Sequence, residues 1–435
     1  MQLGSHHIWL ASIFFSGLVS ARALGFTVTS ESLSPLLAEG NPQVKAALIE
    51  WRASLNKSGS LARSFMPSIS AKGHLEKSSG DVVGGLREPI GTLEVTSNLY
   101  NAQHDQIDSE ISKLEIERLK ISFDRVAIQE LEKAQELYWQ IIYLHEKKSL
   151  ITNMIGLNQK NLKSALSRIE NGVATQSDRF EFEMKIVDLQ RDLAMVDSDL
   201  VSNEVFLKLL LGIGQQIDLQ ISGTLEHVHE GVDAFETETG PVDIFFAEYE
   251  LIGKQHALSA KALRQSWEPK IDLFAAYNRY DAESVTSPSG VRAESDESSR
   301  GETVFGVRMS MNLQVASNSY YDADSYIKRA EAARIRGDFA RREAKSHLDR
   351  EIKLLRILHD QVHGAGQNIA RAEIYYKLTS AEYARGVKNS PDVLGAAVKL
   401  QEVRMKYLEI IKDYEISRSH VTIKAGLSKI SQPAQ

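Results

Sequence analysis

One stretch of the chain occurs twice, and this repeat limits the folds that the chain can adopt. Residues 168–213 align without a gap with residues 382–427, an offset of 214 positions. Few identities survive, but apolar residues recur at alternating intervals of three and four, which is typical of a coiled-coil seam. The matched apolar pairs are Ile186/Leu400, Leu189/Val403, Leu193/Tyr407, Val196/Ile410, Leu200/Tyr414 and Leu207/Val421. A chain built twice from one such unit is a repeat protein.

Each half is predicted to contain a short helix, two strands, a very long helix, a glycine-containing tip and a medium helix. Alternating apolar and polar residues predict strands at about 67–75 and 91–100 in the first half, and at about 269–280 and 303–314 in the second. Helical hairpins are expected at about 102–212 and 320–426. The predicted divisions are repeat 1 (24–213), a linker (214–241) with a short strand at 217–221, repeat 2 (242–427) and a loose C-terminal tail (428–435).

The predicted helices differ greatly in length. The helix over 102–170 would extend ~100 Å, the helix over 178–211 would extend ~50 Å, and the helix over 42–63 would extend ~33 Å. Stacked end to end, the two shorter helices would nearly cover the long one.

The first residues resemble a secretory signal peptide. An apolar run at 8–19 precedes Ala21-Arg22-Ala23, a small-x-small cleavage pattern, so residues 1–23 are expected to be removed on export. The segment before the apolar run lacks Lys and Arg, and the alternative is a retained anchor or a wrongly assigned start. No later apolar run reaches the ~18 residues of a membrane-spanning helix. The absence of cysteine fits an oxidising compartment, and the net charge of −7 argues against nucleic-acid binding.

The four predicted strands each have one apolar side and one polar side. A sheet with an apolar face needs a cover, but the neighbouring helices are too long to fold back over it as a compact lid. The alternative is that the apolar side faces lipid and the polar side faces water inside a closed barrel. Four strands cannot close a barrel, because about eight is the smallest usual number. Several chains would therefore share one barrel.

Short motifs, duplicated in a fixed order, resemble the TolC-like outer-membrane efflux and secretion ducts (outer membrane efflux protein family). The motifs are Asn41-Pro42, the strand openers at 66–70 (MPSIS) and 268–273 (EPKIDL), the helix ends at 211–213 and 425–427, and the two tips, in which Gly172 and Gly386 each precede an aspartate by six positions. In one respect the chain departs from the family, because Asn98-Leu99 and Asn312-Leu313 replace a usual Pro-Leu. This departure puts the bend between strand and helix in doubt.

The resemblance implies a mainly helical homotrimer with a small β part. Three chains would form a twelve-stranded barrel in the lipid of the outer membrane and a twelve-helix tunnel in the periplasm. The tunnel would dock on a periplasmic adaptor protein and an inner-membrane transporter. The duct would conduct substrate passively, without a cofactor or enzymatic activity.

The family's closed gate implies specific tip residues. It joins an aspartate of the first tip to a tyrosine and a cation of the second, which correspond here to Asp178, Tyr383 and Lys388, with Ser177 beside the aspartate. Lys388 stands where the family usually has Arg, so the link should be looser, because Lys lacks the bidentate fork. The alternative is that Asp178 is simply an acid at a helix start, which the helix dipole favours.

Asp392 matches an inward-facing aspartate of the family's pore constriction. In a trimer, three such carboxylates would form a cation-selective ring. The family often has a second acid three residues later, where this chain has Gly395, so the filter should be weaker. A helix-start acid is again the alternative.

No enzymatic constellation is present. The sequence has no Gly-x-Ser-x-Gly elbow, His-Glu-x-x-His or phosphate loop. His227 and His229 lie in a linker that is expected to be an exposed loop and have no third ligand nearby in sequence, so a metal site is not expected. A periplasmic coiled-coil scaffold or adaptor without a pore is the competing function, but it would not require strands with an apolar face.

Overall fold

The structure is a computed structural model, and it describes residues 26–61, 66–73, 91–101, 103–172, 175–225, 242–280, 300–311 and 318–424. The predicted signal peptide, the C-terminal tail and residues 226–241 of the linker, including His227 and His229, lie outside the described residues, as do Asn312 and Leu313.

The two halves of the chain contain the same elements in the same order. The first half has α2 (Pro42–Leu61), β2 (Ser68–Gly73), β3 (Gly91–Asn101), α3 (His104–Glu170) and α4 (Gln176–Leu210). The second half has α5 (Val242–Arg264), β5 (Lys270–Tyr280), β6 (Arg300–Ser310), α6 (Asn318–Ala384) and α7 (Ser390–Lys424). The two long helices both have 67 residues and the two helices after the tips both have 35, so the repeat in sequence is also a repeat in structure. The mainly helical fold class with a small sheet is confirmed.

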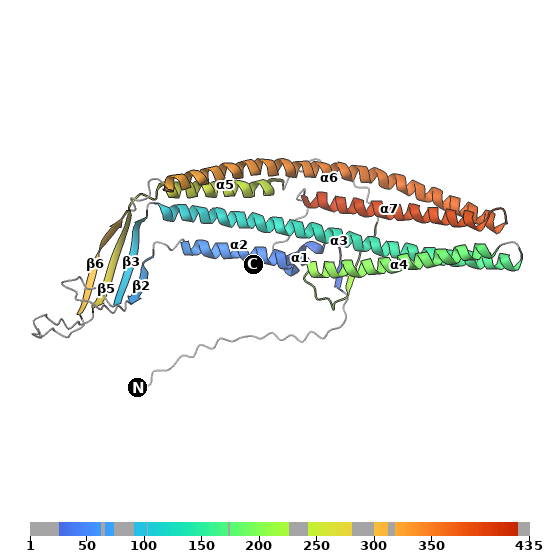
Figure 1. Ribbon diagram of the computed structural model, residues 1–435, viewed down its shortest axis with the longest axis horizontal. Helices are drawn as coiled ribbons and strands as arrows, with labels where there is room; N and C mark the ends of the chain where they lie inside the picture. Colours follow the sequence, from blue (N-terminus) through green and yellow to red (C-terminus); the bar gives the residue numbers. More distant parts are fainter. Residues whose placement is uncertain are drawn as a thin grey trace, which may run out of the picture.

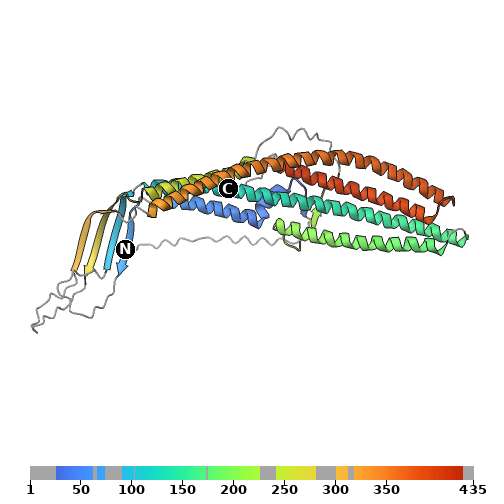
Figure 2. The ribbon, with the colours of Figure 1, turned by 45° about the horizontal axis from the view of Figure 1, so that its top comes forward.

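The long helices run most of the length of the molecule. α2 and α4 lie end to end along α3, and α5 and α7 lie end to end along α6 (Figure 1). The sheet lies beyond one end of the helices, and the two hairpin tips lie at the other end (Figure 1, Figure 2). No helix in the described ranges is both long enough and apolar enough to cross a membrane.

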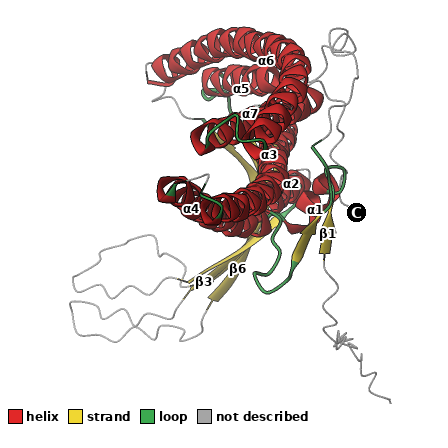
Figure 3. Ribbon diagram, turned by 90° about the vertical axis from the view of Figure 1, so that its right-hand side faces the viewer, coloured by secondary structure: helices red, strands yellow, loops and turns green. Residues whose placement is uncertain are grey.

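The elements form a single curved row with two open edges. α3 packs against α2, α4, α5 and α7, whereas α6 packs against α5 and α7 (Figure 3). One edge of the helical row is therefore α2 with α4, and the other edge is α6. The four strands follow the same order, β2-β3-β5-β6, with every neighbouring pair antiparallel. The open edges of the sheet thus lie on the same sides as the open edges of the helical row.

The repeated seam forms the core between the helices of each hairpin. Eight of its twelve residues are buried and the other four are half-buried. The buried ones are Leu189, Val196, Leu200, Leu207, Leu400, Ile410, Tyr414 and Val421.

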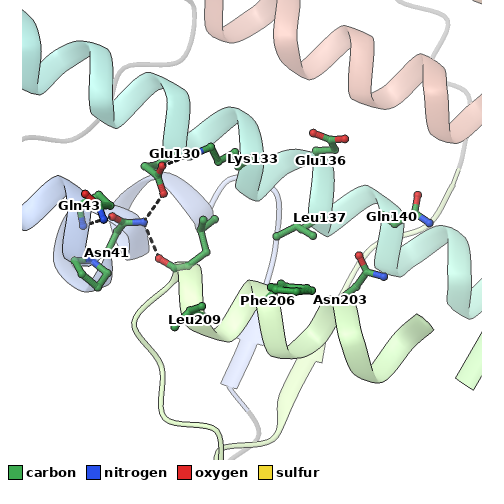
Figure 4. A pocket seen from close by; sticks show the side chains of 12 residues that line it. Asn41, Gln43, Glu130, Lys133, Glu136, Leu137, Gln140, Asn203, Phe206 and Leu209 are labelled. Carbon is green, nitrogen blue, oxygen red and sulfur yellow. Dashed lines mark hydrogen bonds and ion pairs between the residues drawn. The ribbon is translucent and has the colours of Figure 1, made fainter. Parts of the chain in front are cut away.

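The junction between α2 and α4 is held by Asn41, which is 1% exposed. Its amide nitrogen donates to Oε2 of Glu130 (3.0 Å) and to the carbonyl of Leu210 (2.9 Å), while its oxygen accepts the N–H groups of Gln43 (2.8 Å) and Val44 (2.9 Å) (Figure 4). One side chain thereby caps α2 and ties it to α3 and to the end of α4. A pocket of about 770 Å³ opens beside this network.

A small two-stranded sheet at mid-length was not predicted. β1 (Phe26–Val28) pairs in parallel with β4 (Leu219–Ile221), and α1 (Leu33–Gly40) follows β1. The hydroxyl of Tyr138 in α3 donates to the carbonyl of Ser222 (2.8 Å) and fixes this sheet to the helices. The strand expected at 217–221 is shorter than predicted, because only residues 219–221 find a partner.

The strand bounds differ from the predicted ones mainly in β6. It begins at Arg300, three residues before the expected start, because it pairs with β5 along its whole length from Lys270↔Ser310 to Tyr280↔Arg300. At the other end of the sheet, the register of β3 shifts between Asn98 and Tyr100. Asn98 and Asn101 then donate to Asp105 in the first turn of α3, at 3.0 and 3.4 Å. These bonds hold the bend between strand and helix where the family has Pro-Leu.

Candidate functional site

The sheet has one exposed apolar face. Phe305, Val307 and Met309 of β6 are 83%, 63% and 65% exposed. Ile69, Leu93, Leu273 and Tyr277 on the neighbouring strands are exposed on the same face, whereas Ile271 is half-buried. The apolar face is therefore not covered by the helices of its own chain.

The opposite face of the sheet carries polar and charged groups that join its strands. Glu94 of β3 is 8% exposed and accepts a hydrogen bond from the Arg308 guanidinium of β6 at 2.6 Å. Lys72 of β2 lies 3.7 Å from the same carboxylate, and the Arg308 guanidinium stacks over the ring of Phe274 in β5, 4.5 Å from its centroid. This charged cluster connects all four strands on the face away from the apolar residues.

The two tips are turns that require glycine. Gly172 and Gly386 have φ angles of 73° and 78°, in the left-handed region that side-chain-bearing residues rarely adopt. Both glycines follow the last residues of a long helix, so they end α3 and α6 and reverse the chain.

Asp178 is both a helix cap and a contact between the two hairpins. One carboxylate oxygen accepts the N–H (2.7 Å) and the hydroxyl (3.1 Å) of Thr175, forming a capping box. The other oxygen accepts a hydrogen bond from the Ser390 hydroxyl at the start of α7, which also lies 3.1 Å from Glu181. Partial burial raises the pKa of Asp178, but the hydrogen bonds from Ser390 and Thr175 and the nearby Arg168 charge outweigh burial and hold it below its ordinary value.

Tyr383 contacts Arg168 rather than Asp178. The guanidinium carbon of Arg168 lies 4.2 Å from the centroid of the Tyr383 ring, and the same guanidinium donates to the Tyr383 carbonyl. The tyrosine is 4% exposed, and its buried hydroxyl has no hydrogen-bond partner among the described residues. Burial raises the pKa of Tyr383, with Asp178 adding to the effect and Arg168 opposing it. Within one chain, the family-based pairing of Asp178 with Tyr383 is thus replaced by Ser390–Asp178 and Arg168–Tyr383.

The remaining predicted tip residues lie at the surface or close to it. Lys388 is half-buried, and no carboxylate of the described residues lies within ion-pair distance of it. Ser177 is exposed. Asp392 is also exposed, and its carboxylate accepts the N–H of Asn389 at 3.2 Å, so it caps the start of α7. The described residues contain no group of acidic or histidine side chains that could hold a metal ion.

Arg168 and Ser390 were missed by the sequence analysis as site residues. Each contacts a residue more than 200 positions away in the sequence, and neither lies in a sequence motif that predicts such a contact. The alignment of the two repeats is the one sequence feature that could have indicated Arg168. It pairs residue 168 with residue 382, which directly precedes Tyr383.

Comparison with known proteins identifies one family. Residues 255–422 match the family described as outer membrane efflux protein. No curated protein matches the chain significantly.

Several solved structures share the fold over almost the whole chain. CusC, whose structures concern transmembrane channel formation, superposes with a TM-score of 0.72 at 15% identity, covering 92% of this chain and 93% of CusC. The outer membrane protein VceC of Vibrio cholerae gives 0.74 at 11% identity, with 91% and 96% covered. The open state of the Neisseria gonorrhoeae MtrE outer membrane channel gives 0.70 at 15% identity, with 93% and 90% covered.

The matched family consists of efflux proteins rather than enzymes, and its outer-membrane location agrees with the location expected from the sequence. Because the structural relatives share at most 15% of their residues with this chain, their likeness establishes the fold. The family match and the shared fold together confirm the resemblance to the outer membrane efflux proteins, whose domain this chain carries at residues 255–422.

Proposed function

We propose that the protein is a passive outer-membrane channel that forms a homotrimer. The observation that carries the proposal is the pair of matching open edges: β2 with α2 and α4 on one side, and β6 with α6 on the other. Joining β6 of one copy to β2 of the next would extend both the sheet and the helical row in one step. Three copies with four strands each would give a barrel of twelve strands, which exceeds the ~8 strands needed for closure.

The two faces of the sheet support placing this barrel in lipid. Phe305, Val307 and Met309 would contact acyl chains, whereas Glu94 and Arg308 would face water inside the barrel. The strands of 11 residues in β3, β5 and β6 have the length of a tilted bilayer crossing, about 9–11 residues. Residues 1–23 would act as the export signal and be cleaved after Ala23.

The helical tunnel would then extend into the periplasm and carry substrate from partner proteins. α3 and α6 are each ~100 Å long, which is enough to reach far from the outer membrane. In the proposed assembly, the tips contact a periplasmic adaptor and an inner-membrane transporter of an efflux or type I secretion system. The chain itself would conduct and would not catalyse.

The tips would form the closed end of the tunnel. Asp178 and Lys388 are the proposed link between neighbouring chains, since Lys388 has no carboxylate partner among the described residues of its own chain. Arg168–Tyr383 and Ser390–Asp178 would hold the two tips of each chain together. Asp392, exposed at the start of α7, would contribute one carboxylate per chain to a ring at the constriction.

The proposal is tested by adding the purified protein to a planar lipid bilayer and recording current. We expect small, cation-selective channels from a detergent-solubilised trimer that dissociates on heating. A soluble monomer without channel activity would instead favour a periplasmic scaffold and would overturn the proposal.

A further inference from the structure

Among the described strand residues, the apolar face of the sheet carries one charged side chain, that of Arg279 in β5. Side chains alternate between the two faces of a strand, so Arg279 lies on the same face as Leu273 and Tyr277. It is exposed, and no carboxylate of the described residues lies within ion-pair distance of it. A charged side chain on a surface that faces lipid is unfavourable unless it reaches an anionic group or water at the edge of the bilayer.

Arg279 stands in a row across the sheet that otherwise contains only glycine. The register pairs it with Gly91 of β3 on one side and with Gly301 of β6 on the other, and Gly91 pairs in turn with Gly73 of β2. A Cβ atom added to Gly91 would meet nothing within 4 Å, so packing within the chain does not require a glycine there. The row leaves bare backbone on both sides of one guanidinium, which gives a bulky group room to approach it.

Tyr277 supplies a second hydrogen-bond donor beside this row. A Cβ atom added to Gly301 would collide with the Tyr277 hydroxyl, so the tyrosine ring leans over Gly301 towards the end of the sheet. Directly paired residues have Cβ positions about 4.5–5.5 Å apart, so this hydroxyl lies close to the base of the Arg279 side chain. Both groups donate hydrogen bonds, and an anion at this point can accept from both.

The row lies at the height expected for lipid headgroups. It is at the end of the sheet that is farther from the helices (Figure 1). Arg279 is nine residues beyond Lys270, which is about 30 Å along the strand. In a barrel whose strands tilt by about 40°, this corresponds to about 23 Å of height, close to the ~25 Å of the apolar band. With the helices in the periplasm, Arg279 would therefore reach the headgroups of the outer leaflet.

We propose that Arg279 and the Tyr277 hydroxyl bind the phosphate of an outer-leaflet lipid, whose headgroup occupies the space above the glycine row. This inference rests on the proposed function, which places the apolar face in the outer membrane. The planar guanidinium can donate two parallel hydrogen bonds to one phosphate. Phosphorylated glycolipids have headgroups of the required kind, a phosphate carried on a bulky sugar ring. A trimer would present three such sites at one height, separated by glycine, because Gly301 of one copy would lie beside Gly73 of the next.

The site is tested on the trimer purified in detergent and titrated with diphosphoryl lipid A. A lipid that binds the trimer raises the temperature at which it dissociates on gels. We expect wild type to show a saturable rise, and Arg279→Gln to lower the apparent affinity by about tenfold or more. Arg279→Lys keeps the charge without the bidentate fork and should be intermediate. Lys270→Gln is the matched control, because it removes one charge from the other face and the other end of the same strand, and it should respond as wild type does.

A pair of variants in the glycine row separates a built site from a lone charge. The φ angle of Gly91 is outside the left-handed region, so side chains are tolerated there. Gly91→Glu places a carboxylate opposite Arg279, where it pairs with the guanidinium and repels phosphate, and it should abolish the response to lipid A. Gly91→Gln has the same size without the charge and should weaken the response less. A wild-type response in Gly91→Glu would show that the phosphate binds elsewhere.

Two further probes identify the source of the phosphate. Inorganic phosphate at the same concentration, and lipid A from which both phosphates have been removed, should leave the dissociation temperature unchanged. A full response to inorganic phosphate would indicate a site for a free ion, and a full response to the phosphate-free lipid or in Arg279→Gln would indicate binding through acyl chains alone.

Either result would overturn the proposed lipid site while the trimer and its conductance stand. A wild-type chain that neither forms a trimer nor conducts in a planar bilayer would instead remove the proposed function, and the lipid site with it.

Discussion

The guanidinium of Arg168 stacks on the ring of Tyr383, with its central carbon 4.2 Å from the ring centroid. The two residues lie in the last turns of α3 and α6, so the contact joins the tips of the two hairpins of one chain. A cation–π contact contributes about 0.5–2 kcal/mol, depending on how far it is desolvated. Tyr383 is almost fully buried whereas Arg168 is half-buried, which places this contact near the middle of that range.

We expect Arg168→Ala to open the proposed channel. Losing about 1 kcal/mol in each of three chains would change the free energy of a concerted opening by about 3 kcal/mol, on the order of a hundredfold in the open-to-closed ratio. Single-channel recording in a planar bilayer would show a raised open probability.

Tyr383→Phe is the matched control for this experiment. The Tyr383 hydroxyl has no hydrogen-bond partner among the described residues, so the phenylalanine ring should keep the Arg168 contact and the closed state. If Tyr383→Phe opened the channel as strongly as Arg168→Ala, the hydroxyl would be the essential group and the stacking explanation would fail.

The second prediction concerns the link between chains at the tips. Because Asp178 and Lys388 are proposed to form one link, Asp178→Ala with Lys388→Ala should enlarge the conductance relative to wild type, but by less than the sum of the two single changes. Both side chains lie near the surface, so each ion pair would stabilise the closed state by only about 0–1 kcal/mol. Three such pairs in the proposed trimer are needed for a measurable change in conductance. Purely additive or absent effects on conductance would assign Asp178 to helix capping alone.

The third prediction concerns the pH dependence of the same carboxylate. The pKa of Asp178 is lower in the folded protein than its ordinary value of 3.8. Its stabilising contribution is therefore complete above that value and is lost as the pH falls through the lower, folded pKa. Opening that separates Ser390 from Asp178 would return the pKa of this carboxyl towards 3.8, so protonation favours the open state. We therefore expect wild-type channels to stay closed at neutral and mildly acidic pH and to open more often below about pH 4. In Asp178→Asn this component of the conductance–pH curve should disappear, and an unchanged curve would refute the assignment.

The repeated seam explains why most of the helical fold could be predicted. The spacing of residues such as Leu207 and its counterpart Val421 predicts their burial, because a helix brings every third or fourth residue to one face. Strand alternation is equally local, and it placed the start of β3 at residue 91 and the end of β5 at residue 280.

The contacts that were missed depend on residues far apart in sequence. β1 has only three residues and becomes a strand because β4, about 190 positions later, supplies its partner. Arg168 and Ser390 find their partners only because the two hairpins lie side by side. The bend before α3 could not be predicted for a similar reason. The Asn98 and Asn101 amides stabilise it by donating hydrogen bonds to Asp105, and they can do so only once the fold has placed Asp105 at the helix start.

The fourth prediction concerns the junction between the stacked helices. Asn41→Ala removes four hydrogen bonds. Among the described residues it leaves the buried Glu130 with Lys133 as its one remaining partner, at 2.6 Å. Losing the cap and leaving the Leu210 carbonyl unpaired should destabilise the protein by about 2–3 kcal/mol. The midpoint of thermal unfolding, followed by helical circular dichroism in detergent, should fall. Asn41→Asp keeps the cap of α2 but places two carboxylates together, so a midpoint equal to that of wild type would show that only the cap matters.

The last prediction concerns the charged cluster that spans the sheet. Arg308 reaches from β6 across the Phe274 ring of β5 to Glu94 of β3, so a single side chain joins the strands of both halves. Among the residues that the structure describes, Arg308→Met would leave Glu94 with Lys72 alone, 3.7 Å away and largely exposed. Because Arg308 itself is half exposed, we expect a loss of about 1–3 kcal/mol rather than the larger loss of a fully buried pair.

The double variant Glu94→Gln/Arg308→Met separates this pair from its surroundings. Glu94→Gln removes the charge that Arg308 compensates, so the double variant should be less destabilised than the sum of the two single variants. The temperature at which the trimer dissociates on gels measures each effect. Arg308→Lys keeps the charge but loses the planar group that stacks on Phe274, and it should fall between wild type and Arg308→Met. Strict additivity of the two single changes would mean that the bond between β3 and β6 does not stabilise the sheet.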